Sequence, residues 1–208
     1  YSFIFFSILG GGIWATTRQK NLSLNISDGF IITTLFWVVL ACAGSIPFYF
    51  FMGLGISDAI FESVSGITTT GATTIVGLDS LPKSILLYRQ LLQWIGGMGL
   101  IVLAVAVMPA LGIGGGQLYK MELPGSHGNQ KLTPKITDSA KALWKIYVGL
   151  TVLCATLYLL SGMTLFDSVA HSLSTVAGGG FSTHDQSIGF FNSALIESVC
   201  IIFMLLSA

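Results

Sequence analysis

Charge is the property that this sequence has least of. Only 9% of its 208 residues are charged and 53% are hydrophobic, whereas charged residues make up about a quarter of a typical soluble domain. The mean hydropathy is +0.82. This composition excludes an ordinary soluble domain and indicates that lipid is the main solvent. The formal net charge is zero, so bulk electrostatics predict no nucleic-acid partner.

Cysteine is also scarce. Cys42, Cys154 and Cys200 each lie inside an apolar run, without the spacing of metal ligands or of a paired extracellular framework. We interpret them as small hydrophobic side chains. The sequence has no initiator methionine and no signal-peptide pattern, and it stops within an apolar run. We therefore expect an internal piece of a longer protein.

Long apolar runs are what the sequence does have. A transmembrane helix needs about 20 residues, and several runs reach that length. The expected organisation is the end of a preceding membrane helix with a cytoplasmic linker (1–29), a first span–pore helix–span repeat (30–113), a cytoplasmic loop (114–141) and a second repeat truncated in its last span (142–208). Within these units we expect complete spans at 30–51, 85–113 and 142–163, and the start of another at 188–208.

One pattern occurs twice. Residues 58–74 align without a gap with residues 167–183, at a shift of 109 residues, and the identical pairs are Asp58/Asp167, Ser63/Ser172, Ser65/Ser174, Gly71/Gly180 and Thr74/Thr183. Each copy predicts a helix of about 13 residues, which covers roughly 20 Å of a ~30 Å bilayer core. Irregular chain at that depth is tolerated only where protein or a water-filled cavity surrounds it. The predicted fold is an all-α integral membrane protein with repeated span–pore helix–filter loop–span units, as in potassium channels.

The two loops suit an alkali cation. A dehydrated potassium ion needs oxygen ligands, and rings of main-chain carbonyls can supply them. Gly71 and Gly180 tolerate the backbone dihedrals that aim consecutive carbonyls at one axis, and helices that end at these loops direct their partially negative C-termini at the ion. The alternative is that small residues only let membrane helices pack closely. We prefer that alternative for Gly96, Gly97 and Gly99.

The few charges divide between two sides of the expected topology. The positive-inside rule assigns one side to the cytoplasm, and it holds Arg18, Lys20, Lys120, Lys131, Lys135, Lys141 and Lys145. The opposite side holds Asp58, Glu62, Asp79, Asp167, Asp185 and Glu197. Acids around an outer mouth raise the local cation concentration, although Asp58 and Asp167 are also favoured as helix-capping residues. We expect Arg89 to anchor its helix at the outer interface, with its charge snorkelling towards water.

Two other functions stay open from the residues alone. An intramembrane serine hydrolase needs a Ser–His pair, which could be drawn from Ser65 or Ser174 and from His171 or His184. Ser174 and His171 are close only because they share one expected helix, and no nucleophile-elbow pattern surrounds either serine. We therefore expect no enzyme. A non-conducting helical scaffold is the third alternative.

Four motifs occur in order along the chain. They are residues 66–73 (GITTTGAT), 88–99 (YRQLLQWIGGMG), 131–134 (KLTP) and 180–185 (GFSTHD). Together they resemble the bacterial TrkH/TrkG potassium-uptake family of the Trk/Ktr/HKT superfamily. The resemblance implies four repeats around one central pore, preceded by two extra helices. This chain would hold the end of that extra pair, the first repeat and most of the second.

The resemblance also implies the ion ligands. It maps one filter glycine onto Gly71 and another onto Gly180, and it maps the potassium-binding main-chain carbonyls onto Thr69, Thr70, Gly71, Ala72, Gly178, Gly179, Gly180 and Phe181. A glycine rather than a serine at position 71 implies a preference for potassium over sodium. A sodium- or mixed-cation-conducting member is the alternative, and channel-like diffusion and coupled symport both stay open.

Several partners are implied in the same way. The resemblance implies a multi-pass protein of the bacterial inner membrane that contacts lipid, forms a homodimer and binds a cytosolic nucleotide-binding ring of the TrkA type. The polar segment 114–141 is expected to contribute to the ring contact, with a plain solvated loop as the alternative. Potassium would be the transported ligand, and no cofactor is expected.

Overall fold

The computed structural model describes residues 26–110 and 132–207. The helices in these ranges are α2 (Ile26–Met52), α3 (Ile56–Ile67), α4 (Lys83–Ala110), α6 (Leu132–Leu160), α7 (Leu165–Val176) and α8 (Ala194–Ser207), with the short 3-10 helices η1 (Leu78–Ser80) and η2 (Ser187–Phe191). No strand occurs within the described ranges, so the prediction of a helical fold is confirmed there. Predictions that concern residues 1–25 and 111–131 lie outside the described residues.

Three helices are long. α2, α4 and α6 have 27, 28 and 29 residues, so each is roughly 40 Å long and exceeds the ~30 Å bilayer core. Within the described residues, Thr34–Met52 of α2 and Ala140–Leu160 of α6 are long and apolar enough to cross a membrane. Only 11% and 22% of the apolar windows of these two segments are buried in the structure, which fits a surface that faces lipid or further protein.

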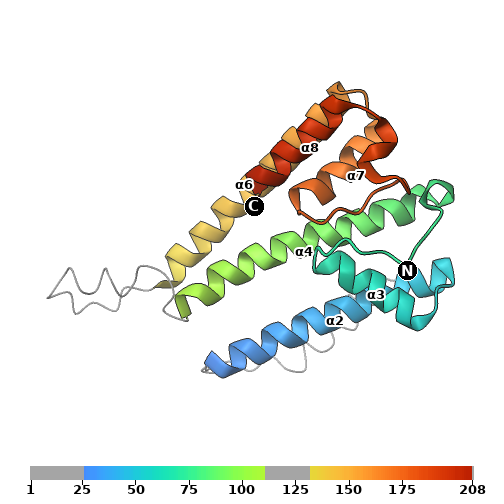
Figure 1. Cartoon of the computed structure of the whole chain (residues 1–208). Coiled ribbons are helices and arrows are strands. Elements are labelled where there is room, and N and C mark those ends of the chain that lie inside the picture. Colours follow the sequence, from blue (N-terminus) through green and yellow to red (C-terminus); the bar gives the residue numbers. More distant parts are fainter. Residues whose placement is uncertain (1–25, 111–131, 208) are drawn as a thin grey trace, which may run out of the picture.

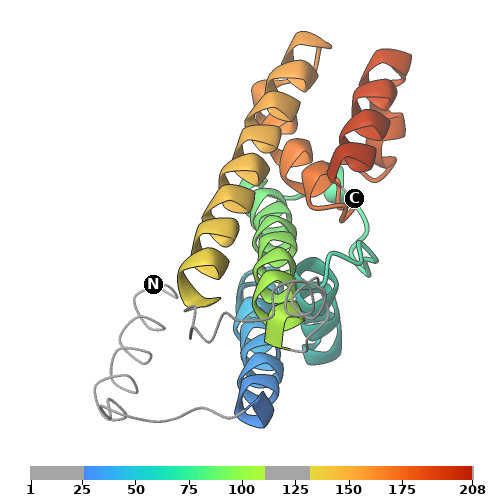
Figure 2. The same cartoon turned by 90° about the vertical axis from the view of Figure 1, so that its left-hand side faces the viewer.

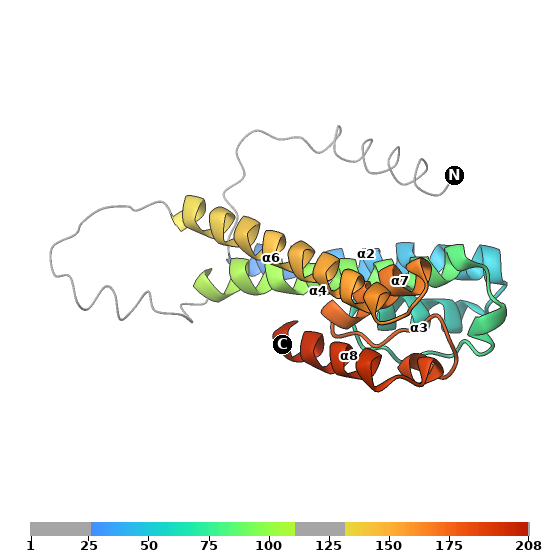
Figure 3. The ribbon, with the colours of Figure 1, turned by 90° about the horizontal axis from the view of Figure 1, so that it is seen from above.

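The long helices form the frame that carries the shorter ones. α4 lies between α2 and α6 (Figures 1 and 2). α3 packs against α2 and α4, whereas α7 packs against α4, α6 and α8. Both short helices lie towards one end of the long helices, as the view from above shows (Figure 3). One helix, α4, therefore contacts both short helices.

Two apolar cores hold this arrangement together. Phe48 and Ile67 belong to the core between α2, α3 and α4, and Tyr158 and Phe203 to the core between α6, α7 and α8. α4 approaches the end of α3 closely, because a Cβ on Gly96 would lie only 1.9 Å from the carbonyl oxygen of Ile67. The interpretation of Gly96 as a packing residue is thus confirmed.

The starts of two long apolar segments differ from the sequence prediction. α6 begins at Leu132, so residues 132–141 are helical turns and not part of a loop. Pro134 is compatible with this start because the N–H groups of the first helical turn have no intrahelical partner. The predicted span from residue 188 is also displaced, since the chain first forms η2 and begins α8 only at Ala194.

The two short helices are 12 residues each, or about 18 Å long. They begin at Ile56 and Leu165, two residues before the aspartates that were expected to open them, and end at Ile67 and Val176. The predicted ends at residues 70 and 179 are wrong by three residues. The reason is the positive φ of Thr69 and Gly178, which ends each helix.

Candidate functional site

The two short helices end in the same way. After α3, the N–H of Thr69 donates to the carbonyl of Gly66 (3.1 Å) and the N–H of Thr70 to that of Ser65 (2.9 Å). After α7, the N–H groups of Gly178 and Gly179 donate to the carbonyls of Thr175 (3.1 Å) and Ser174 (2.9 Å), which are the positions 109 residues further on. Each pair of bonds is a Schellman motif, which closes a helix and turns the chain away from its axis.

The loops also share their unusual backbone angles. Thr69 and Gly178 have φ values of 55° and 66°, and Gly71 and Gly180 have 77° and 82°. The residues between them, Thr70 and Gly179, are not in the positive-φ region. In an ordinary strand, successive carbonyl groups point in opposite directions. Residues with positive φ alternate here with residues that have negative φ, and this departure from strand geometry can turn consecutive carbonyls to the same side. Thr69 is the costly member, because a β-branched residue with positive φ is strained.

The loops meet backbone to backbone. A Cβ on Gly71 would lie 1.9 Å from the carbonyl oxygen of Gly179, so only a glycine fits there. A Cβ on Gly180 or on Gly178 would meet nothing within 4 Å. Two positions that are equivalent in the sequence repeat therefore have unequal surroundings. Gly71 is required by both its φ value and a neighbouring carbonyl, whereas Gly180 is required by φ alone.

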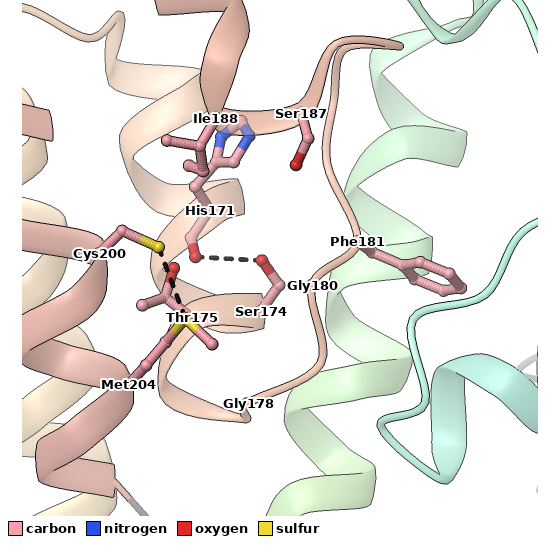
Figure 4. A pocket seen from close by; sticks show the side chains of 10 residues that line it. All are labelled: His171, Ser174, Thr175, Gly178, Gly180, Phe181, Ser187, Ile188, Cys200 and Met204. Carbon is pink, nitrogen blue, oxygen red and sulfur yellow. Dashed lines mark hydrogen bonds between the residues drawn. The ribbon is translucent and has the colours of Figure 1, made fainter. Parts of the chain in front are cut away.

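The residues mapped as potassium ligands do not share one environment. Thr70, Ala72, Gly178 and Gly180 are exposed, Thr69 and Gly71 are half-buried, and Gly179 and Phe181 are buried. The carbonyl of Ala72 accepts a hydrogen bond from the hydroxyl of Ser65 (2.5 Å), so it is turned back towards α3. The Phe181 side chain extends away from the other residues of a small cavity beside the second loop (Figure 4).

A buried ion pair lies behind the first loop. Glu62 of α3 and Arg89 of α4 are both 0% exposed, and Nη2 of Arg89 lies 2.8 Å from Oε1 of Glu62. Glu62 also accepts hydrogen bonds from the hydroxyl of Thr73 (2.5 Å) and from the N–H of Thr74 (3.2 Å). Two predictions are wrong here: Glu62 is not a mouth acid, and Arg89 does not snorkel to an interface. Each is held inside because the other neutralises it.

Arg89 reaches the second loop as well. Its Nη1 donates to the carbonyl of Ser182 (3.2 Å), and its guanidinium lies 4.2 Å from the centre of the Phe181 ring. One helical turn further along α4, Oε1 of Gln93 accepts the N–H of Phe181 (3.1 Å). α4 therefore binds two successive residues of the second loop.

The second loop is bound to its own helix by a histidine and an aspartate. Nε2 of His171 lies 2.9 Å from the hydroxyl oxygen of Ser182, and Asp167 accepts the hydroxyl of Thr183 (2.8 Å). The N-cap residue Thr164 and Asp167 also bond to each other, side chain to side chain and side chain to backbone. Asp167 is thus a buried residue of the first helical turn that bonds to the N-cap side chain, and not an exposed mouth acid, whereas α3 has no side-chain cap and Asp58 is exposed.

A cluster of acidic side chains and one histidine links the ends of the two loops. Asp185 accepts the N–H groups of Gly77 and Leu78 (both 3.0 Å), and Asp79 contacts the imidazole of His184. The hydrogen bond from His184 lowers the pKa of Asp79 from its ordinary value of 3.8. Of the six predicted mouth acids, Asp58, Asp79, Asp185 and Glu197 are exposed.

The whole chain, residues 1–208, matches the TrkH family of cation transport proteins. The chain belongs to the TrkH family. Its relatives include the Trk system potassium uptake protein TrkH of Vibrio parahaemolyticus (54% identity over 98% of this chain and 43% of the relative) and that of Escherichia coli K12 (54%, 96% and 42%). The Trk system potassium uptake protein TrkG of Escherichia coli K12 is 49% identical over 100% of this chain and 43% of its own length.

A solved TrkH-family structure has the same fold. The crystal structure of the potassium transporter TrkH from Vibrio parahaemolyticus superposes with a TM-score of 0.85 at 49% identity, covering 99% of this chain and 41% of that one. The chain therefore spans about two fifths of the length of the relatives it matches. The predicted resemblance to the TrkH family is confirmed.

The family and the relatives are named for cation transport and potassium uptake, and the two serines considered for hydrolysis bond to main-chain carbonyls. The hydroxyl of Ser174 donates to the main-chain carbonyl of His171 (3.2 Å), and that of Ser65 to the carbonyl of Ala72. Neither hydroxyl bonds to an imidazole in these contacts. The imidazole of His171 contacts Ser182 instead.

Sequence reasoning missed the roles of Arg89, Glu62 and Gln93 in this TrkH-family chain. A signal was present, since an ionisable side chain within an apolar segment predicts a buried partner and a functional position. Among the charged residues of the segment 58–99, Glu62 is the acid and Arg89 the base that lie farthest from the ends of the helices, and both are fully buried. Pairing them by charge would have found the contact, but not the link to Ser182.

Proposed function

We propose that this chain forms two span–pore helix–filter loop–span repeats of a potassium-translocating protein, with 58–74 and 167–183 as the two copies of the pore helix and filter loop. The observation that carries the proposal is the shared geometry of the two loops, which have the same Schellman closure and the same positive φ positions and meet at Gly71 and Gly179. Such a backbone suits a filter built from carbonyl oxygens.

The proposed ligands are the main-chain carbonyls of residues 69–71 in the first loop and 178–180 in the second, with Ala72 and Phe181 at the edges of the two sets. The Ala72 oxygen already accepts the Ser65 hydroxyl, so an ion there would share an acceptor. No carboxylate is needed at the ion. Weak coordination by dipoles lets the ion leave again, which conduction requires.

The relatives named as potassium uptake proteins support potassium as the cargo, and Gly71 supports potassium over sodium. A sodium- or mixed-cation-conducting protein is the alternative. The proposal also includes a multi-pass location in the bacterial inner membrane, a homodimer and a cytosolic nucleotide-binding ring of the TrkA type. These follow from the resemblance, and a ring contact near 114–141 involves residues that are partly outside the described ranges.

The test is uptake of rubidium against sodium into proteoliposomes that contain the full-length protein. We expect selective rubidium uptake by the wild type and loss of that selectivity in Gly71→Ser, because the new side chain displaces the Gly179 carbonyl. Gly149→Ser is the matched control, since a Cβ there meets nothing within 4 Å. Negligible uptake by the folded wild type would overturn the proposal, and preferential sodium uptake would favour the alternative.

A further inference from the structure

Arg89 is the one described side chain that donates hydrogen bonds to groups of both loops. On one side Nε and Nη2 bind Oε1 of Glu62 (3.1 and 2.8 Å), and Nη2 also donates to the hydroxyl of Thr73 (3.0 Å). On the other side Nη1 donates to the carbonyl of Ser182 (3.2 Å). A continuous path of charge-assisted bonds thus runs from the first loop to the second.

The attachment points have a consistent place in each loop. Glu62 binds Thr73 and Thr74, which directly follow the first set of proposed ligands. Gln93 binds the N–H of Phe181, the last residue of the second set, and Arg89 binds the carbonyl of Ser182, which directly follows it. The ion pair therefore sets where each ligand segment ends relative to α4.

Stability alone does not account for these charges. Burying a carboxylate and a guanidinium costs several kcal/mol in desolvation, and apolar side chains of similar volume often stabilise a protein as well or better. Apolar residues cannot donate hydrogen bonds. The planar guanidinium donates hydrogen bonds in several fixed directions at once. A lysine could satisfy Glu62, but its single nitrogen cannot reproduce the fork.

The second half contains no equivalent of this pair. At the shift of 109 residues, Glu62 corresponds to His171 and Arg89 to Ser198. Ser198 is exposed, and its hydroxyl donates to the carbonyl of Ala194 within its own helix. The second loop is thus bound by an arginine that belongs to the first half.

We infer that Arg89 is a positioning residue for both loops, fixing the first through Glu62 and the second through the carbonyl of Ser182. This inference rests on the proposed function, in which the two loops line an ion pathway. It predicts that ion selectivity depends on the directions of the Arg89 hydrogen bonds. Filling the same volume and leaving no unpaired charge behind the loops would not be enough.

Two variants of the full-length protein test this in proteoliposomes. Arg89→Lys keeps the charge opposite Glu62 but loses the bond to Ser182. The double variant Glu62→Leu with Arg89→Met replaces the pair by apolar side chains, which removes the desolvation cost and supports folding. Lys83→Gln is the control, because it removes an exposed positive charge from the start of the same helix, where the side chain lies over the Phe166 ring of α7 and makes no hydrogen bond or ion pair that joins the two loops.

We expect the rubidium-to-sodium uptake ratio, measured per folded protein, to fall about tenfold in Arg89→Lys and in the double variant, as for the loss of one charge-assisted hydrogen bond. The Lys83→Gln control should keep the wild-type ratio. A wild-type ratio in the double variant would overturn the inference, and so would failure of both variants to assemble, since the pair would then serve folding. An unselective wild type would instead refute the proposed function.

Discussion

The two helix–loop units of this chain have the same backbone and different chemistry. Each has a 12-residue helix closed by a Schellman motif, followed by two left-handed residues at matched positions. In each, a loop hydroxyl bonds to a side chain of the helix: the Thr73 hydroxyl donates to Glu62, and the Ser182 hydroxyl bonds to Nε2 of His171. The same hydroxyls accept an N–H two residues later, from Ile75 (3.1 Å) and His184 (3.0 Å).

The difference lies in charge. At the equivalent positions 62 and 171, the first unit uses a carboxylate that is paired with a buried arginine, whereas the second uses an imidazole. The second unit's own buried carboxylate, Asp167, lies 3.5 Å from Nε2 of His184. The comparison shows that one loop geometry can be held by two kinds of bond. It also shows that the units are unequal in function, because the arginine required by the first also binds the second.

The largest expected effect comes from removing the charge of the first unit. Glu62→Gln leaves Arg89 buried without a counter-ion, and we expect it to lower the free energy of unfolding by about 3 kcal/mol or more. His171→Gln places the same amide at the equivalent position of the second unit, where it can still bond to Ser182. We expect that change to cost about 1 kcal/mol.

Thermal unfolding of the two variants of the full-length protein in detergent measures this difference. Wild-type protein and Lys83→Gln provide the reference values. Equal losses in the two glutamine variants would show that the Glu62–Arg89 charges are not what distinguishes the units.

The second comparison uses equivalent glycines. Gly71→Ala and Gly180→Ala both place an alanine at positive φ, which costs about 1–2 kcal/mol. At Gly71 alone, the Cβ also collides with the carbonyl of Gly179, and we expect a further loss of about 1–3 kcal/mol from overpacking. Unfolding midpoints and the rubidium-to-sodium uptake ratio should both change more in Gly71→Ala. If Gly180→Ala were the more damaging change, the contact between the loops would be without consequence.

The smallest effect concerns the C′ positions of the two Schellman motifs. Thr69 is strained there with φ of 55°, whereas Gly178 occupies the equivalent place without a Cβ. We expect Gly178→Thr to destabilise the protein by about 1 kcal/mol and Thr69→Gly to stabilise it by less than that, since glycine also loses more backbone entropy on folding. Chemical or thermal unfolding of the two exchanges would measure this, and a destabilised Thr69→Gly would mean that the threonine side chain outweighs the strain.

Several features of the fold were predictable because they depend on near neighbours. The short helices before Gly71 and Gly180 follow from small, polar-flanked segments too short to cross a bilayer, and they were placed to within three residues. Their ends were missed because the positive φ at Thr69 is not a property that threonine favours. The start of α6 was missed because the polar, lysine-bearing segment 114–141 suggested a loop, although its last ten residues are helical and proline is tolerated in a first helical turn.

The roles of the polar residues were less predictable. Arg89 carries the same sequence signal whether it faces water at an interface or a carboxylate in the interior. Its burial is decided by Glu62, 27 positions away, and its second bond by Ser182, 93 positions away. No local pattern contains that information, because the cost of burying a charge depends on which groups the packed helices bring beside it.

By itself, the sequence determined that this chain is a helical membrane protein with two similar helix–loop units, because hydrophobicity, helix length and the position of a glycine are local properties. Only the tertiary structure decided that Gly71 lies against the Gly179 carbonyl and that one ion pair joins both loops. These contacts arise where α4 packs between α3 and α7, and a contact between distant segments exists only once the helices that carry them have packed.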